Sequence, residues 1–230
     1  MKKVITIMLA AMMLTMSSAY AARFEDTQGH WAEAEIDILA EKGIVSGISA
    51  SRFAPDAEVT RAQYLKMIMQ ATGLKTTPYR AGECLEAKAS DWYAPYLQKA
   101  LDCGLIPESM IAGYKENVIY TVDETGKATE SKVVYSGAFN GDLNISREEM
   151  AVLTQYFYQY TRTVRTNKET DLSDINTFND EDAISDWAKQ SVKMAVANGF
   201  IKGSSNNMFN PKDATTRAQA ATVINRVISK

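Results

Sequence analysis

Apolar residues in this chain recur with helical spacing, in pairs of short segments separated by polar turns. The apolar positions of the first segment follow the i, i+3, i+4 pattern of one helix face: Ile36, Leu39 and Ala40. They predict a helix from about Trp31 to Lys42. A second helix is predicted to begin after Thr60 and to bury Leu65 and Ile68. The pattern therefore predicts helix–loop–helix units and a mainly α fold.

The same unit occurs three times along the chain. In each unit a tryptophan at the start of the first helix is followed 12 residues later by a glycine: Trp31 and Gly43, Trp92 and Gly104, Trp187 and Gly199. Each second helix begins with an arginine that follows a phenylalanine by 8 residues: Phe53 and Arg61, Phe139 and Arg147, Phe209 and Arg217. These matched spacings predict three copies of one structural unit.

The middle unit contains an insertion between its two helices. The step from the glycine to the phenylalanine is 10 residues in the outer units and 35 in the middle one. The inserted segment, about 107–138, contains β-rich runs at 118–122 and 132–135, with turn residues between them. We expect a β-hairpin, which is either a decorated loop or a surface that contacts a partner.

Each second helix is predicted to start with a capping box, in which a hydroxyl residue and the residue three positions later cap each other. The pairs are Thr60 with Gln63, Ser146 with Glu149, and Thr216 with Gln219. The glycine after each first helix stands where a left-handed residue commonly ends a helix.

The first residues have the layout of a secretory signal peptide. A basic head at Lys2 and Lys3 precedes an uncharged apolar run, and Ala19 and Ala21 occupy the A-x-A positions. We expect a signal peptide at 1–21, with an uncleaved anchor or a buried helix as the alternative. No later stretch is long enough to cross a bilayer, so a transmembrane protein is not expected.

The overall charge narrows the choice of partner. The full chain carries a net charge of −3, and the part after the predicted signal peptide has 23 basic and 28 acidic residues, a net charge of −5. No basic stripe is visible, which argues against nucleic acid. An anionic partner would have to be bound by local arginines against the overall sign.

Two cysteines and one histidine limit the chemistry. Export permits a disulfide, and Cys84 and Cys103 flank a predicted helix, so a bridge and two free thiols are equally supported. Their spacing fits no zinc pattern, and we expect no metal. The other units have Asp91 and Asp186 in place of His30, which indicates a helix-start role rather than catalysis. No catalytic motif is present, so we expect neither enzyme activity nor a cofactor.

The repeated arginines are the first candidate ligand-binding residues: Arg61, Arg147 and Arg217. Each follows a helix cap, beside unpaired N–H groups and the positive end of the helix dipole, and its guanidinium suits a carboxylate or phosphate. A structural salt bridge to a neighbouring acid is an equally supported alternative. Asp26 and Asp180, early in the outer units, could cap a helix or pair with an arginine, and a structural role is favoured.

Tryptophans and loop glycines are the other candidates. Trp31, Trp92 and Trp187 start the first helices, where core packing is favoured over stacking on a sugar. Gly47 and Gly203 come four residues after the glycines that end these helices. They predict a tight loop whose backbone amides face a ligand, or a plain turn.

The combined motif closely resembles the S-layer homology domain. In the first unit it runs Phe-x-Asp, Trp-Ala, Gly-Ile-Val-x-Gly, Phe-x-Pro and Thr-Arg-Ala-Gln. The resemblance covers about 23–75, 84–160 and 172–230, and the polar segment 161–171 is typical of a linker. It implies a pseudo-threefold prism around a central helical bundle. It also implies grooves between repeats that bind secondary cell wall polymer, often through a pyruvylated sugar. By position, the contact with the acidic group falls to Arg61, Arg147 and Arg217.

The middle repeat departs from the family pattern. It has Glu149 where the outer repeats have Gln63 and Gln219, and it lacks the Phe-x-Asp start, with Leu85 nearest in register. Glu108 replaces the second loop glycine and would repel an acidic ligand. We therefore expect one or two working grooves rather than three.

These observations favour an exported, non-catalytic anchor that is bound to the bacterial cell wall or cell surface through an anionic glycan. The alternative is a structural surface-layer-type subunit, or a module that docks protein cargo or self-associates through the insertion. A glycan hydrolase is a distant third hypothesis.

Overall fold

The computed structural model describes residues 24–162 and 178–230, and this part of the chain is rich in helix. Its helices and strands are, in chain order, α1 (Glu33–Glu41), α2 (Arg61–Ala71), α3 (Ala94–Asp102), β1 (Ala112–Val122), β2 (Ala128–Ala138), α4 (Arg147–Arg162), α5 (Asp186–Ala197) and α6 (Arg217–Ile228). The structure is compatible with the predicted mainly α fold. The predicted signal peptide lies outside the described residues. So does most of the predicted linker at 161–171, whose first two residues belong to α4.

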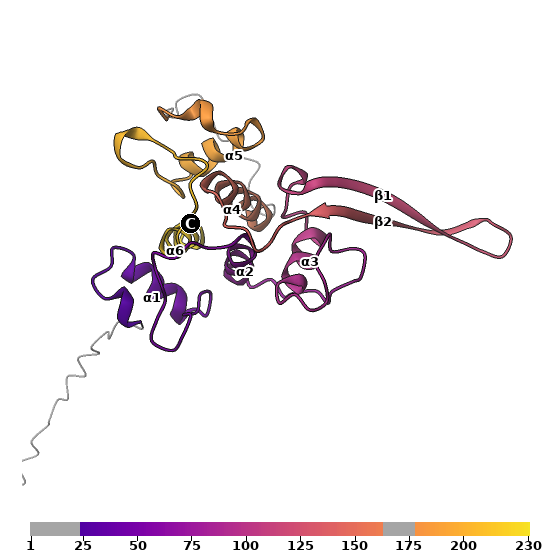
Figure 1. The fold of residues 1–230 in the computed structure, drawn as a ribbon, viewed down its shortest axis with the longest axis horizontal. Coiled ribbons are helices and arrows are strands. Elements are labelled where there is room, and N and C mark those ends of the chain that lie inside the picture. The colour runs from indigo at the N-terminus through magenta and orange to yellow at the C-terminus, as the bar shows by residue number, and fades with distance from the viewer. Residues whose placement is uncertain (1–23, 163–177) are drawn as a thin grey trace, which may run out of the picture.

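The second helices of the three units form the middle of the molecule. Helices α2, α4 and α6 contact one another pairwise, and α1, α3 and α5 lie around them (Figure 1). Each first helix packs on a second helix from another unit, since α1 contacts α6, α3 contacts α2 and α5 contacts α4. The three sequence units therefore interlock.

A closed cycle of backbone hydrogen bonds joins the residues just before the second helices. The N–H of Val59 donates to the carbonyl of Thr215 (2.9 Å), that of Thr215 to Ile145 (3.0 Å), and that of Ile145 to Val59 (3.0 Å). The side chains of Val59, Ile145 and Thr215 are fully buried. Because each unit supplies one donor and one acceptor, no unit can leave without breaking two of these bonds.

The predicted caps are confirmed. Thr60 and Thr216 each accept a hydrogen bond from the backbone N–H of the glutamine three residues later, whose side chain accepts from the backbone N–H of the threonine. Ser146 and Glu149 exchange the same two bonds (3.3 and 2.9 Å). The bounds of the second helices are therefore set by local sequence.

One carboxylate per unit holds the segment that leads into the second helix. Each accepts two backbone N–H groups at 2.7–2.8 Å: Asp26 from Phe53 and Ala54, Glu86 from Phe139 and Asn140, and Asp180 from Phe209 and Asn210. The second residue of each pair has a positive φ, between 53° and 59°, a conformation that L-residues adopt at a cost. The structural role favoured for Asp26 and Asp180 is thus observed, and Glu86 plays the same part in the middle unit.

The carboxylate of Asp26 should make stability depend on acid. Its burial opposes ionisation, but hydrogen bonds from the N–H groups of Phe53 and Ala54 outweigh this and hold its pKa below the ordinary value of 3.8. A carboxylate whose pKa is lower in the folded state contributes its full stabilisation at pH values above the unfolded-state pKa. This stabilisation is lost as the pH falls through the folded-state pKa. We expect the urea midpoint to fall more steeply between about pH 4 and pH 2 in the wild type than in Asp26→Asn.

Exposed Glu25 supplies the matched control for this acid titration. Glu25→Gln should keep the wild-type profile of urea midpoint against pH. Parallel profiles for the wild type and Asp26→Asn would contradict the assigned role.

The insertion forms the predicted hairpin. Strands β1 and β2 pair antiparallel, with Glu116 opposite Tyr135 and Tyr120 opposite Ser131. Both strands are longer than the β-rich runs in the sequence, because the pairing continues back to Ala112 and Ala138 at the base. The hairpin extends away from the helical body (Figure 1).

The two thiols are free, so the disulfide that the sequence left open is absent. Cys84 is buried, with its Sγ 3.5 Å from the carbonyl of Ala94, whereas Cys103 is partly exposed and accepts a hydrogen bond from the hydroxyl of Tyr160 (3.5 Å). The two sulfur atoms have separate surroundings, so flanking the same helix is not enough to bring them together.

Candidate functional site

All three repeated arginines donate to a backbone carbonyl of another unit, and Arg147 and Arg217 do so in the same way. Arg217 donates from Nε to the carbonyl of Phe53 and from Nη2 to that of Ser46, both at 2.8 Å. Its guanidinium carbon lies 4.4 Å from the centre of the Phe53 ring. Arg147 makes the corresponding contacts with the carbonyls of Phe209 (2.8 Å) and Lys202 (3.2 Å). These direct contacts are to carbonyls and a ring, while acids act on the guanidinium groups only at longer range: Asp26 on Arg217, and Asp213 and Asp180 on Arg147.

The helix N-termini themselves are closed to ligands. The first N–H of each second helix donates to a carbonyl of another unit: Arg61 to Leu143, Arg147 to Asp213 and Arg217 to Ala57. The next N–H in each helix is used in the same way, and the third donates to the capping side chain. This corrects the expectation that unpaired helix N–H groups would help to bind an anion. Only the guanidinium groups remain for that role.

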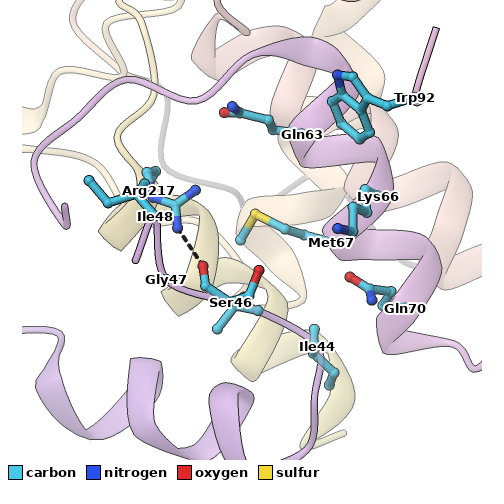
Figure 2. A pocket seen from close by; sticks show the side chains of 11 residues that line it. Ile44, Ser46, Gly47, Ile48, Gln63, Lys66, Met67, Gln70, Trp92 and Arg217 are labelled. Atoms are coloured by element: carbon cyan, nitrogen blue, oxygen red, sulfur yellow. Dashed lines mark hydrogen bonds between the residues drawn. The ribbon is translucent and has the colours of Figure 1, made fainter. Parts of the chain in front are cut away.

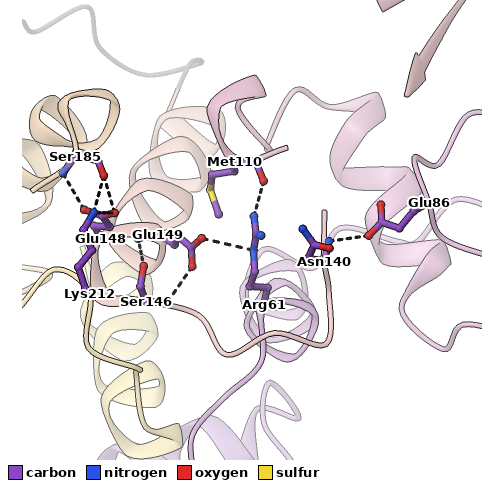
Figure 3. Close-up of polar contacts among 9 residues, drawn as sticks. All are labelled: Arg61, Glu86, Met110, Asn140, Ser146, Glu148, Glu149, Ser185 and Lys212. Atoms are coloured by element: carbon purple, nitrogen blue, oxygen red, sulfur yellow. Dashed lines mark hydrogen bonds and ion pairs between the residues drawn. The ribbon is translucent and has the colours of Figure 1, made fainter. Parts of the chain in front are cut away.

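Arg61 differs from the other two arginines, because it is almost completely buried, with 6% of its surface exposed. Its Nη2 donates to the carbonyl of Met110, and its Nε lies 3.9 Å from Oε1 of Glu149 (Figure 3). The guanidinium also lies over the Phe139 ring, 4.7 Å from its centre. Burial lowers the pKa of Arg61 from its ordinary value, while Glu149 and Glu86 act to raise it. For Arg61, the predicted alternative of a structural salt bridge is what the structure shows.

A groove of about 270 Å³ lies between the first and second units, beside Arg217 (Figure 2). Its floor is the loop 44–48, which contains Gly47, and one wall is α2. The polar and aromatic residues that line it are Ser46, Gln63, Lys66, Gln70, Trp92 and Arg217. Three different units thus contribute to one groove.

The charge of this groove is positive. Lys66 and Arg217 line it, and no acidic residue is among the described residues that line it. Gln63 stands where the middle unit has Glu149, the acid that pairs with Arg61. Burial lowers the pKa of Arg217 from its ordinary value, but an arginine in a protein remains protonated. The groove therefore presents two cations in a chain whose net charge is negative.

The repeated tryptophans are exposed, which overturns the preference for core packing. The exposed fractions are 62% for Trp31, 50% for Trp92 and 39% for Trp187. The residue after each tryptophan is buried: Ala32, Tyr93 or Ala188. Each tryptophan therefore lies one position before the buried face of its helix and outside it. Trp92 lines the groove, with Nζ of Lys66 5.9 Å from its ring centre. Trp31 and Trp187 are not brought to this groove.

The loop glycines are required by close packing. A Cβ on Gly47 would lie 2.5 Å from the Phe24 ring, and one on Gly203 would lie 2.7 Å from the Phe178 ring. In the middle unit the smaller Cys84 stands where the outer units have these phenylalanines. The middle unit has no ring at that position, and it has Glu108 where the outer units have these glycines. Gly47 also lines the groove.

Sequence reasoning missed two residues. Glu86 was hidden because its unit has Cys-Leu-Glu where the first has Phe-Glu-Asp. Lys66 was missed because lysine does not recur at its helix position. Five residues after the repeated arginine, α4 has Val152 and α6 has Thr222, and both are buried. The signal available in the sequence was a single lysine at a position where the other two second helices have valine and threonine.

The part of the chain that the structure describes has neither a metal-ligand cluster nor a membrane-spanning helix. Among the described residues, no group of three or more histidine, cysteine or acidic side chains is arranged to hold a metal ion. No helix in the described ranges combines the length and the apolar character needed to span a bilayer.

Comparison with known proteins shows which domain family this sequence resembles. The profile of the S-layer homology domain matches residues 23–65 and 177–221. An amylopullulanase from Thermoanaerobacterium thermosulfurigenes is 30% identical over 92% of this chain, and the exoglucanase XynX from Acetivibrio thermocellus is 31% identical over 90%. An S-layer protein from Bacillus thuringiensis subsp. finitimus is 28% identical over 97% of the chain.

The similarity covers only a small part of each relative. The matched segments account for 10%, 16% and 24% of the amylopullulanase, the exoglucanase and the S-layer protein, respectively. What these relatives share with the chain is therefore the S-layer homology region, and the matches bear out the predicted association with the cell wall or cell surface. The chain therefore carries two matches to the S-layer homology domain, at residues 23–65 and 177–221.

Proposed function

We propose that this protein is a non-catalytic anchor that binds an acidic cell-wall glycan in the groove between α2 and the loop 44–48. S-layer homology domains anchor proteins to the cell wall, and two stretches of this chain match the family. The observation that carries the proposal is the groove itself, which combines two cations, an exposed indole and a volume of about 270 Å³. This volume lies just below the roughly 300 Å³ at which typical small-molecule sites begin, so it suits a small ligand such as one sugar unit.

The charges of the groove favour an acidic ligand. Arg217 donates to the carbonyls of Ser46 and Phe53, so its guanidinium group is held in place before a ligand binds. Lys66 lies on α2 on the opposite wall (Figure 2). A carboxylate between them, such as that of a pyruvylated sugar, would pair with both cations. Little ordering cost would remain for the arginine.

Trp92 favours a sugar over a small anion. Half of its surface is exposed, and it borders the groove at one end. The apolar face of a pyranose can stack on an indole, while its hydroxyl groups reach the amides of Gln63 and Gln70. The acidic group and the sugar ring would then contact different sides of the same groove.

The other two inter-repeat sites are not equivalent to this one. The site beside Arg61 is closed by Glu149 and by the carbonyl of Met110, so we assign it no ligand. The site beside Arg147 has the loop glycine Gly203 and the corresponding arginine contacts, and it is the second candidate. We therefore propose one principal groove and one weaker groove.

The same proposal includes the architecture that the resemblance implies. Three repeats at about 23–75, 84–160 and 172–230 would form a pseudo-threefold prism. The pairwise contacts of α2, α4 and α6 and the closed hydrogen-bond cycle at Val59, Ile145 and Thr215 support it. Residues 1–21 would be removed on export.

A pull-down with purified cell walls tests the function. The chain from residue 22 onward is mixed with walls before and after the non-peptidoglycan polymer is stripped. We expect binding to intact walls and its loss from stripped walls, because the acidic groups are carried by that polymer. Binding that survives stripping would point to peptidoglycan or protein as the partner and would refute the acidic-glycan proposal.

A further inference from the structure

The hairpin β1–β2 is an isolated two-stranded ribbon. It pairs with no third strand among the described residues, and nearly all residues of β1 are exposed. Four large apolar residues of β1 are about half exposed or more: Val118, Ile119, Tyr120 and Val122. Ribbons of this kind are marginally stable in water unless another strand or a helix covers them.

The second half of β1 carries few of the features that block strand pairing. The pairing of β1 with β2 shifts register between Ala112 and Lys115 and between Thr121 and Val122, but residues 117–121 are regularly paired. The last six residues of β1, 117–122, read Asn-Val-Ile-Tyr-Thr-Val, with no charge, proline or glycine. Edge strands that must stay single usually carry charges, proline or a bulge at such positions. Exposed β-branched and aromatic residues at a free edge favour the addition of a further strand.

We propose that this edge pairs antiparallel with β1 of a second copy of the chain, about a twofold axis at Ile119. The product is a four-stranded sheet with the order β2–β1–β1–β2. The proposal concerns association between copies and does not depend on the glycan groove, because no hairpin residue lines that groove.

Charge complementarity selects this register. With Ile119 on the axis, exposed Lys115 of each copy lies opposite Asp123 of the other. Moving the axis to Tyr120 would instead set Glu116 against Glu124 of the other copy, a like-charge pair. The three hydrogen bonds that Asp123 accepts from Thr125 and Lys127 all fall on Oδ1, which leaves Oδ2 for the lysine.

The same register continues one apolar face across the sheet. Side chains alternate along a strand, so Glu116, Val118, Tyr120 and Val122 share a face, which is apolar from Val118 onward. Tyr135 of β2 belongs to it as well and stacks on Tyr114 with ring centres 6.0 Å apart. Across the axis, Val118 would pair with Tyr120 of the other copy, an aromatic and β-branched pair of the kind that stabilises sheets. The two ribbons would then shield each other's apolar residues.

Sedimentation velocity over roughly 1–100 µM protein, a range suited to a small interface, tests the proposal with the full chain. We expect a dimer that forms with rising concentration. Ile119→Lys places two like charges on the axis and should give a monomer throughout. The control is Ser131→Lys, an exposed residue of β2 that pairs with Tyr120 inside the hairpin, and it should dimerise like the wild type.

Cross-linking tests the register. In a Cys103→Ser background, Ile119→Cys should give a covalent dimer under mild oxidation or with a short bismaleimide, because the two thiols would face each other. Thr121→Cys should cross-link far less, since it would face Asn117. A monomeric wild type, a dimer that Ile119→Lys leaves intact, or equal cross-linking at both positions would each overturn the proposal. Loss of dimerisation without loss of wall binding would separate it from the proposed function.

Discussion

Replacing Lys66 with glutamate is expected to weaken binding of this protein to acidic wall polymer by roughly a hundredfold. Lys66 and Arg217 are the two cations of the groove, and the substitution turns an attraction into a repulsion. Lys66 is the cleaner of the two to change. Arg217 also ties the third repeat to the first through two carbonyls, so its loss would mix binding with stability. Binding isotherms with polymer released from the wall measure the effect.

The control for Lys66→Glu is Lys42→Glu, which makes the same change in net charge at an exposed position after α1. It should bind within about twofold of the wild type if local rather than overall charge decides binding. Lys66→Gln should fall between the wild type and Lys66→Glu. Equal weakening by Lys42→Glu and Lys66→Glu would contradict the assignment of this groove.

Replacing Arg61 with alanine should act on stability instead. The substitution leaves Glu149 without its cation and the carbonyl of Met110 without its donor, in a site where the arginine was almost fully buried. Breaking a buried pair from one side costs about 3 kcal/mol of unfolding free energy. Urea unfolding should show this loss. Wall binding by the folded protein should remain, because Arg61 is not among the residues that line the groove.

Two companion variants make the Arg61 prediction specific. Arg52→Ala removes an arginine with 64% of its side chain exposed, and should cost less than about 0.5 kcal/mol. The double variant Arg61→Ala with Glu149→Gln should lose less than the two single losses combined, because the unpaired charge is gone. A stable Arg61→Ala that no longer binds walls would reverse the roles assigned to Arg61 and Arg217.

Much of the local structure could be predicted from the sequence. The capping boxes at Thr60, Ser146 and Thr216 fix where the second helices begin, since a cap needs only residues three positions apart. The hairpin follows from two β-rich runs and a turn between them. The family could be recognised for the same reason, because its motif is a string of such local signals at fixed spacings.

The site could be predicted only in part. The matched spacings predicted the same environment for the three arginines. The residues that surround each arginine, however, come from another unit. Arg61 meets the altered middle repeat with Glu149, whereas Arg217 meets the glycine loop of the first repeat. The indole of Trp92 was expected inside, yet it borders the groove, because one helix position decides whether a side chain lies on the buried stripe.

The sequence by itself determined three helix–loop–helix units, their caps, the inserted hairpin and the arginine that repeats in each unit, all of which depend on neighbours along the chain. Only the tertiary structure decided that α1 packs on α6, that the helix N–H groups are used between units, and that Lys66, Trp92 and Arg217 meet in one groove. These three residues come from three different units. Their meeting depends on how the units interlock, and contacts between residues so far apart in sequence leave no periodic signal.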